Sequence, residues 1–230
     1  MALIPSRLLP PGLTHDQAAE PRILLGDPGS DPVRPCLVFL CFDDSGSLTS
    51  GHDPVGARYN EAQKALTHIG AAARTGMQQV AVFRFDHPRV GAVGPYPLNM
   101  KQRLRKLERA IHPPKDTAGA STLTPAMMAM NRAADRHPDA DRVAVIFSDF
   151  ELVDQQPRQP YDEMGAFPGI VHAVVMNSVP PPELTDIPNV LITRVSSTDP
   201  PGRLAAALAH TLTQFRVGAT PARLESHHPS

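Results

Sequence analysis

Three oxygen-bearing side chains follow a long apolar run near the start of the chain. The run is C-L-V-F-L-C-F at residues 36–42, and Asp43, Ser45 and Ser47 come directly after it at alternate positions. Alternate residues of an extended turn point to the same side, so one carboxylate and two hydroxyls can converge on one point. The stretch predicts either a polar turn or helix cap, which these residue types often form, or one part of a metal site.

Two later segments carry side chains of the same kinds. Ser148 and Asp149 end another apolar run, and the stretch G-A-S-T at 119–122 leads into an expected helix. If the two apolar strands are neighbours, all three segments meet at one edge of the sheet. They then bring together two carboxylates and three or four hydroxyls, with no Cys or His nearby. Such hard oxygen donors favour Mg²⁺ or Mn²⁺, and less often Ca²⁺.

The order of the expected elements determines whether these segments can meet. Apolar runs predict strands at 36–42, 79–85, 90–98, 142–149, 169–176 and 189–195, and helical spacing predicts helices at 57–74, 101–111, 124–136 and 202–216. This alternation predicts an α/β fold of three layers, with a doubly wound, mostly parallel sheet and one antiparallel edge strand. Ligands of such sheets bind outside the carboxyl ends of the strands, where the predicted donors lie.

The 230 residues suit one such domain with irregular ends. Residues 1–33 are rich in Pro, Gly and Asp and are expected to form an irregular arm, with a short edge segment at 22–25. Residues 34–217 are expected to form the domain, and 218–230 a disordered tail.

Composition excludes several classes of partner. Lys plus Arg is 22 and Asp plus Glu is 23, so neither nucleic acid nor an anionic membrane is expected. No apolar run approaches the roughly 20 residues that span a bilayer, and the N-terminus does not resemble a secretory signal. Cys36 and Cys41 are five apart in one strand, on opposite faces, so they are expected to be buried free thiols. That favours a reducing compartment and a cytoplasmic location.

The three polar segments together resemble the von Willebrand factor A (vWA) domain family and its metal-ion-dependent adhesion site (MIDAS). They are D-x-S-x-S after a buried strand, Ser-Thr before a helix, and Ser-Asp after a later strand. P-Y-P-L-N at 95–99 resembles the family's edge strand, and S-T-L-T-P-A-M at 121–127 resembles its T-x-L-x-x-A-L. The resemblance covers roughly residues 35–216, and three motifs in the right order are a fairly specific signal. It implies the Rossmann-like vWA fold.

The resemblance also implies a set of metal ligands. They are Asp43, Ser45, Ser47, Ser121, Thr122 and Asp149. Ser121 stands where the family usually has Thr, and Thr122 is the alternative if the loop shifts by one residue. Phe150 stands where Gly is common, so its ring is expected either to line a ligand surface or to pack under a loop. Asp44 is expected to support the site or lie at the surface rather than bind the metal.

The function that the resemblance implies is interaction and not catalysis. A partner protein supplies an Asp or Glu to Mg²⁺ or Mn²⁺, and the long polar loops 48–57 and 151–168 select that partner. Intracellular bacterial members often work beside AAA+ ATPases or in stress and defence assemblies. Two alternatives stay open: a magnesium-dependent phosphohydrolase-type enzyme, and a scaffold with an empty site. The first lacks the D-x-D motif, since Ser45 occupies the second acidic position.

Overall fold

The computed structural model describes residues 23–45, 55–112, 119 and 121–224. Its main sheet has six strands in the order β4-β3-β2-β5-β6-β7. Their bounds are β2 Cys36–Phe42, β3 Gln78–Arg84, β4 Val93–Pro97, β5 Asp141–Ser148, β6 Ile170–Met176 and β7 Val190–Val195. All neighbours are parallel except β3 and β4. The predicted, mostly parallel sheet with one antiparallel edge strand is confirmed.

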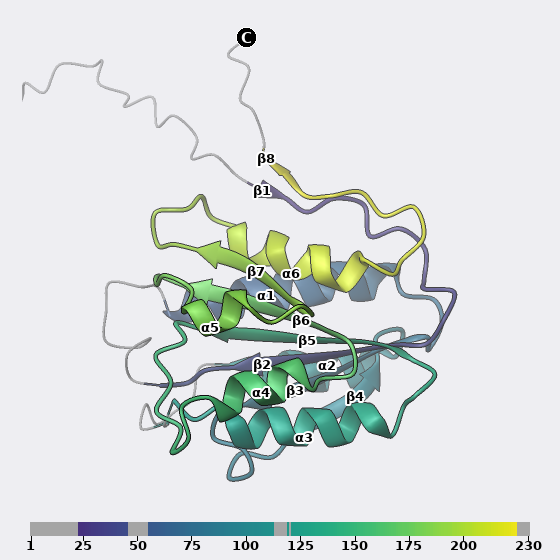
Figure 1. Ribbon diagram of the computed structural model, residues 1–230. Coiled ribbons are helices and arrows are strands. Elements are labelled where there is room, and N and C mark those ends of the chain that lie inside the picture. Colours follow the sequence, from purple (N-terminus) through teal and green to yellow (C-terminus); the bar gives the residue numbers. More distant parts are fainter. Residues whose placement is uncertain (1–22, 46–54, 113–118, 120, 225–230) are drawn as a thin grey trace, which may run out of the picture.

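Helices cover both faces of this sheet. They are α1 Val55–Ala72, α2 Lys101–Ala110, α3 Thr124–Asp135, α4 Gln159–Gly165, α5 Pro182–Thr185 and α6 Arg203–Thr213. Figure 1 shows α1 and α6 above the sheet and α3 and α4 below it. Buried side chains of α1, α2 and α6 pack on one face, and those of α3, α4 and α5 on the other. The sheet is therefore the middle of three layers, as the alternation of strands and helices predicted.

Strand β2 is buried over its whole length because helices cover both of its faces. Side chains alternate along a strand, so Cys36 and Phe42 pack on the α1 side, while Phe39 and Cys41 pack on the α3 side. The two cysteines are buried and free. Their predicted placement on opposite faces is confirmed.

The predicted strands and helices occur within a few residues of their expected bounds, but the segment 151–168 differs. It was expected to be a long polar loop, and the structure places α4 within it. Pro160 and Met164 are buried, and the side-chain amide of Asn131 on α3 donates to the carbonyl oxygen of Glu163 at 3.0 Å. Contact with α3 therefore stabilises a helix that is too short to show a pattern of its own. Of the other expected loop, 48–54 lies outside the described residues.

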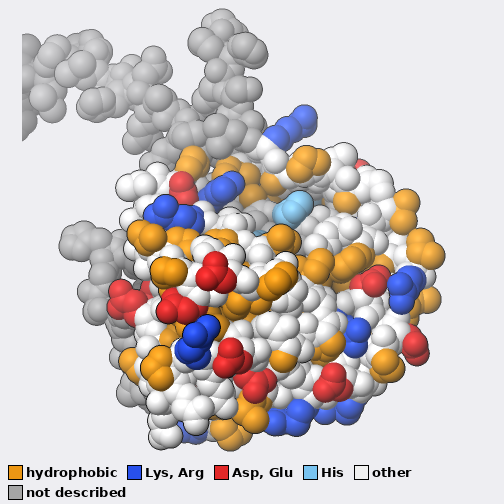
Figure 2. Space-filling model, viewed as in Figure 1, with side chains coloured by type: hydrophobic (Ala, Val, Ile, Leu, Met, Phe, Trp, Pro, Cys, Tyr) orange, Lys and Arg blue, Asp and Glu red, His pale blue; other side chains and the backbone are white. Residues whose placement is uncertain are grey.

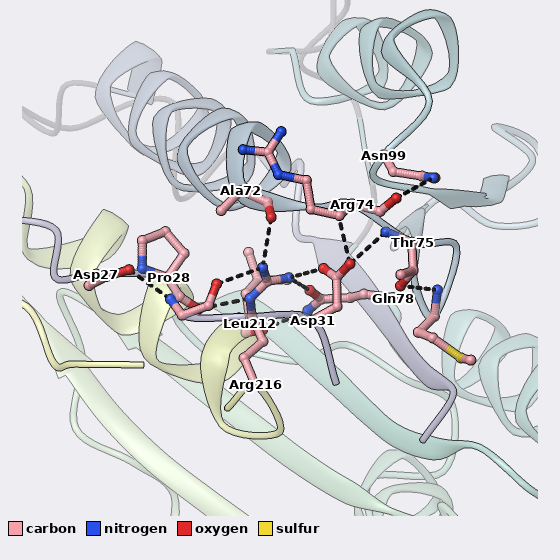
Figure 3. A network of polar contacts seen from close by, with 12 residues as sticks. Asp27, Pro28, Asp31, Ala72, Arg74, Thr75, Gln78, Asn99, Leu212 and Arg216 are labelled. Carbon is pink, nitrogen blue, oxygen red and sulfur yellow. Dashed lines mark hydrogen bonds and ion pairs between the residues drawn. The ribbon is translucent and has the colours of Figure 1, made fainter. Parts of the chain in front are cut away.

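Segments from both ends of the chain lie together beside α6. Strand β1 (Ile23–Leu24) pairs with β8 (Arg223–Leu224) in a separate antiparallel sheet, so the expected edge segment is not an edge of the main sheet. Nearby, the Arg216 guanidinium donates to the carbonyl oxygen of Pro28 at 2.8 Å and to the Asp31 carboxylate at 3.0 Å (Figure 3). The division into an arm, a domain and a tail stays a prediction. The described parts of arm and tail contact each other and the domain.

Candidate metal centre

The carboxyl ends of β2 and β5 lie side by side in the middle of the sheet. The strands are parallel neighbours, and Phe42 pairs with Phe147. Asp43 and Ser148 come next on the two strands. The chain places β3 and β4 on one side of β2, and β6 and β7 beyond β5, so the strand order reverses between β2 and β5. Ligands of doubly wound sheets bind outside such a reversal.

Asp43 is fully buried and is held by both of these segments. The backbone N–H of Ser45 donates to its Oδ1 at 2.9 Å, and the Ser148 hydroxyl donates to its Oδ2 at 2.6 Å. Burial raises the pKa of Asp43, and the negative charge of Asp149 raises it further, while the bonds from Ser148 and Ser45 oppose the rise. A carboxylate fixed near a second negative charge is an arrangement that a bound cation stabilises.

The segment before α3 joins the end of β2 directly. Ser45 and Gly119 form an isolated parallel bridge, and Ser45 and Ser121 are buried. A Cβ atom at residue 119 would lie 3.0 Å from the carbonyl oxygen of Asp44, so this close approach favours glycine. Thr122 is half-buried beside Ser121. Both hydroxyls remain candidates for the ligand from this segment.

The chain after β5 turns back and binds the same segment. The backbone N–H of Val153 donates to the carbonyl oxygen of Ser121 at 3.0 Å. The Asp154 carboxylate accepts from the backbone N–H groups of Leu123 at 3.0 Å and Thr124 at 2.9 Å. Asp154 thus caps the first turn of α3 from a distant part of the chain, a role that the sequence reasoning missed. No local sequence pattern predicts such a cap, because the first residue of the helix and the acid are 30 residues apart.

Asp149 begins this turn and is buried. Its Oδ1 accepts from the backbone N–H of Glu151 at 3.1 Å. Phe150 has φ 61°, a conformation that favours glycine, the residue that the family resemblance predicts there. The residue is 5% exposed and belongs to the core on the α3 side. Of its two expected roles, packing is the one observed.

Asp44 belongs to a different network from Asp43. Its carboxylate accepts from the Tyr59 hydroxyl on α1 and forms an ion pair with Arg84 of β3. Arg84 also donates to the carbonyl oxygen of Ala110 at the end of α2, at 2.7 Å. The expected supporting role of Asp44 agrees with these contacts, whereas a surface position is wrong because only 4% of the residue is exposed.

The predicted ligands within the described residues therefore lie on three segments that are joined at one edge of the sheet. These ligands are Asp43, Ser45, Ser121, Thr122 and Asp149. Ser47 lies outside the described residues. Two carboxylates with hydroxyls suit a hard divalent cation. In the described part of the chain no three His, Cys, Asp or Glu side chains gather to hold a metal, so a cation here would depend on the hydroxyls as well.

Thr124 contributes a further hydroxyl that the sequence reasoning did not single out. It is the first residue of α3 and is buried, and its Oγ1 has no hydrogen-bond partner in the part of the chain that the structure describes. A buried hydroxyl without a partner is unusual and needs a ligand or water to complete it. Thr124 lies three residues after Ser121, on the segment that carries two of the candidate ligands.

Comparison with known proteins adds to this description. Residues 38–151 match the von Willebrand factor type A domain family. No curated protein matches the chain. The pilus adhesin SpaC from Lactobacillus rhamnosus GG superposes with a TM-score of 0.66 at 14% identity, over 81% of this chain and 31% of that one.

Two further solved structures are similar. A von Willebrand factor type A protein from Catenulispora acidiphila superposes with a TM-score of 0.57 at 12% identity, over 85% of this chain and 50% of that one. Proximal thread matrix protein 1 from the mussel byssus, with a zinc-occupied MIDAS motif, superposes with a TM-score of 0.52 at 16% identity, over 81% of this chain and 48% of that one. This chain thus spans from 31% to 50% of the length of these structures, and the likeness shows a shared fold.

The chain contains a von Willebrand factor type A domain, which the family match locates at residues 38–151, and the fold agrees with this assignment. Domains of this family are often adhesion or protein-interaction modules. No helix within the described residues is both long and apolar enough to cross a membrane. Acidic and basic side chains are intermixed on the face drawn in Figure 2.

Proposed function

We propose that this domain is a non-enzymatic protein-interaction module that binds an acidic side chain of a partner through a divalent cation. The observation that carries the proposal is the joining of the three polar segments. Ser148 donates to Asp43, Ser45 bridges to Gly119, and the chain after Asp149 binds the carbonyl oxygen of Ser121. Contacts of this kind set the donors in place before any ligand arrives.

Two kinds of ligand from this chain would hold Mg²⁺ or Mn²⁺. Asp43 and Asp149 supply negative charge, and Ser45, Ser47 and either Ser121 or Thr122 supply neutral hydroxyls. Both oxygens of Asp43 already accept hydrogen bonds, so its carboxylate is oriented to bind directly or through water. A cation with only two protein carboxylates would keep enough positive charge to attract a third from the partner.

The partner in this proposal is another protein that presents an Asp or Glu. A pilus adhesin and a byssus protein with a zinc-occupied MIDAS motif share the fold, and this likeness supports a metal-dependent adhesive role. We place the protein in the bacterial cytoplasm, beside an AAA+ ATPase or within a stress or defence assembly. The two buried free thiols support the reducing compartment.

An enzymatic role receives less support from the residues of the site. A phosphoaspartyl-type hydrolase needs a second carboxylate two residues after Asp43, and Ser45 occupies that position. A serine nucleophile would need a histidine base within reach. His172 is instead buried in β6, where it contacts the hydroxyls of Thr211 and Thr193.

Isothermal titration with Mg²⁺ and with Mn²⁺ tests the proposal. We expect wild type to bind the metal, Asp43→Ala to lose binding, and Asp86→Ala to retain it, because Asp86 lies in a loop and pairs with the exposed Arg89. Circular dichroism would check that each variant folds. Wild type that binds neither metal would contradict the proposal. Hydrolysis of a phosphate ester that disappears in Asp43→Ala would favour the enzyme instead.

A further inference from the structure

Arg58 on α1 is a buried cation that has no counter-ion among the residues that the structure describes. It is 4% exposed, and its Nη2 donates to the Tyr59 hydroxyl at 3.1 Å. Its Nε and Nη1 atoms are buried and have no acceptor among the described residues. A guanidinium stays charged at every physiological pH, and leaving its donors unpaired in the interior is costly. The unpaired donors therefore lack an acceptor among the described residues, and a ligand could supply one.

Two acids that could serve as a counter-ion for Arg58 already have other partners. Glu61, three residues further along α1, caps α6, because its carboxylate accepts from the backbone N–H groups of Gly202 at 2.8 Å and of Leu204 and Ala205 at 3.0 Å. Asp44 binds the Tyr59 hydroxyl and Arg84. Neither acid forms an ion pair with Arg58 in the described part of the chain.

Arg58 forms part of the wall of a cavity of about 190 Å³. The cavity lies at the carboxyl edge of the sheet, between α1, the ends of β6 and β7, and the start of α6. Met176, Val195 and Leu204 give the wall an apolar part, and Glu61 and Asp199 contribute carboxylates. A space of this size holds several water molecules or one small organic group.

We propose that this cavity binds a small monocarboxylate whose charged end accepts hydrogen bonds from Arg58. The long side chain of Arg58 can turn toward the ligand, and charge-assisted hydrogen bonds to a carboxylate are strong. The apolar part of the wall contacts the hydrocarbon end of the ligand. The carboxylates of Glu61 and Asp199 offset the charges of Arg58 and Arg203 in the cavity wall, so a singly charged carboxylate fits better than a doubly charged phosphate. Two sources share this chemistry: a free organic acid and the C-terminal carboxylate of a peptide.

This site is separate from the candidate metal centre, although a chain of contacts connects them. Arg58 donates to the Tyr59 hydroxyl, which donates to Asp44, and Asp44 lies between Asp43 and Ser45. No metal is needed for the carboxylate to reach Arg58. We therefore expect binding to persist in a chelator and in the Asp43→Ala variant, so that failure of one proposal leaves the other testable.

Titration calorimetry of the full chain in chelator tests the site. The probes are isobutyrate, a hexapeptide with a C-terminal valine, the same peptide as its C-terminal amide, and inorganic phosphate. We expect one of the two carboxylates to bind, and Arg58→Met to weaken it by about tenfold or more. Arg105→Gln, which alters an exposed arginine of α2, should bind as wild type does. A preference for the peptide acid over the amide would identify a peptide source, and binding of isobutyrate alone a free acid.

Thermal unfolding without ligand separates this role from a structural one. An unpaired buried charge is destabilising, so Arg58→Met should unfold at the same temperature as wild type or a higher one. Arg58→Lys keeps the charge with fewer donors and should bind with intermediate affinity. The proposal is overturned if neither carboxylate binds to wild type, if Arg58→Met binds them undiminished, if phosphate binds more tightly, or if Arg58→Met unfolds at a clearly lower temperature.

Discussion

Asp43 and Asp44 are adjacent in sequence and have different surroundings. Asp43 contacts the end of β5 through Ser148, and Asp44 contacts α1 and β3 through Tyr59 and Arg84. Successive side chains of an extended segment point to opposite sides, which explains the separation. The buried contacts of Asp44 hold the backbone between two proposed ligands. We therefore expect that loss of the Asp44 carboxylate lowers the stability of the protein. It should lower metal affinity only indirectly, because the backbone between the two proposed ligands is then held less firmly.

Replacing Asp44 by Ala should lower the free energy of unfolding by about 3 kcal/mol, because it leaves the buried Arg84 without its carboxylate. Asp86→Ala is the matched control. Its partner Arg89 is 70% exposed at the side chain, so we expect a change below about 1 kcal/mol. Urea unfolding of the three proteins would measure both values. Equal effects of the two substitutions would contradict the importance of the buried pair.

At the scale of elements, helix α3 is tied to the candidate site by a cap that comes from another segment. Asp154 accepts from the first backbone N–H groups of α3 and thereby connects the turn after β5 to the segment carrying Ser121. The negative charge also lies at the positive end of the helix dipole. This one side chain therefore supports both the helix and the relative placement of two metal-binding segments.

Asp154→Ala should destabilise the protein by about 1 kcal/mol, the usual effect of losing a helix cap. It should also weaken binding of Mg²⁺, since the segment that carries Ser121 loses two of its hydrogen bonds to the turn after β5. Asp135→Ala removes an exposed carboxylate at the other end of α3. It should leave the stability of the protein and its affinity for Mg²⁺ unchanged or slightly improved. Chemical unfolding and metal titration of each variant would test this expectation.

Strand β6 contains a titratable group that makes stability depend on pH. Burial, with a smaller effect of His210, lowers the pKa of His172 from 6.5 to about 4. Between these values the unfolded chain binds a proton that the folded chain does not, so stability falls as pH falls from 6.5 to about 4. The loss is at most about 3 kcal/mol. Urea unfolding at several pH values across this range gives the free energy of unfolding as a function of pH. This dependence should be shallower for His172→Asn and unchanged for the exposed control His112→Asn.

At the scale of the whole molecule, Arg216 joins parts of the chain that are distant in sequence (Figure 3). Its guanidinium contacts Pro28 and Asp31 near one end, the carbonyl oxygen of Ala72 at the end of α1, and the side chain of Gln78 at the start of β3. Arg216 and these four residues form one polar network at the amino edge of the sheet, away from the candidate metal centre. This network holds the described part of the N-terminal segment against the domain.

Arg216→Ala should cost about 3 kcal/mol, because Gln78 and Asp31 lose a buried partner. Arg223→Ala, at an exposed position of β8, should change stability by less than about 0.5 kcal/mol. Hydrogen exchange gives a second measurement: amides of residues 27–31 should exchange faster in Arg216→Ala than in Arg223→Ala. Unchanged exchange would mean that the segment is held by other contacts.

The sequence predicted the fold where the signal was local, whereas the candidate ligands stay a prediction. Continuous apolar runs identified the central strands, and the three polar motifs identified the segments that meet. The short helix α4 and the capping acid Asp154 were not predicted, because both depend on contact with α3 rather than on a periodic pattern. Asp44 was expected to support the site or lie at the surface, and its burial against Tyr59 could not be read from its neighbours in sequence.

By itself, the sequence determined which residues have the chemistry for a metal site, and that they follow strands or precede a helix of one α/β sheet fold, because residue type and periodicity are properties of the chain. Only the tertiary structure decided that β2 and β5 are neighbours, that Phe150 packs into the core, and that Arg58 lies buried with no counter-ion in the described part of the chain. The physical reason is that these features arise from contacts between distant segments, whose cost in chain entropy is offset by burial of the shared core.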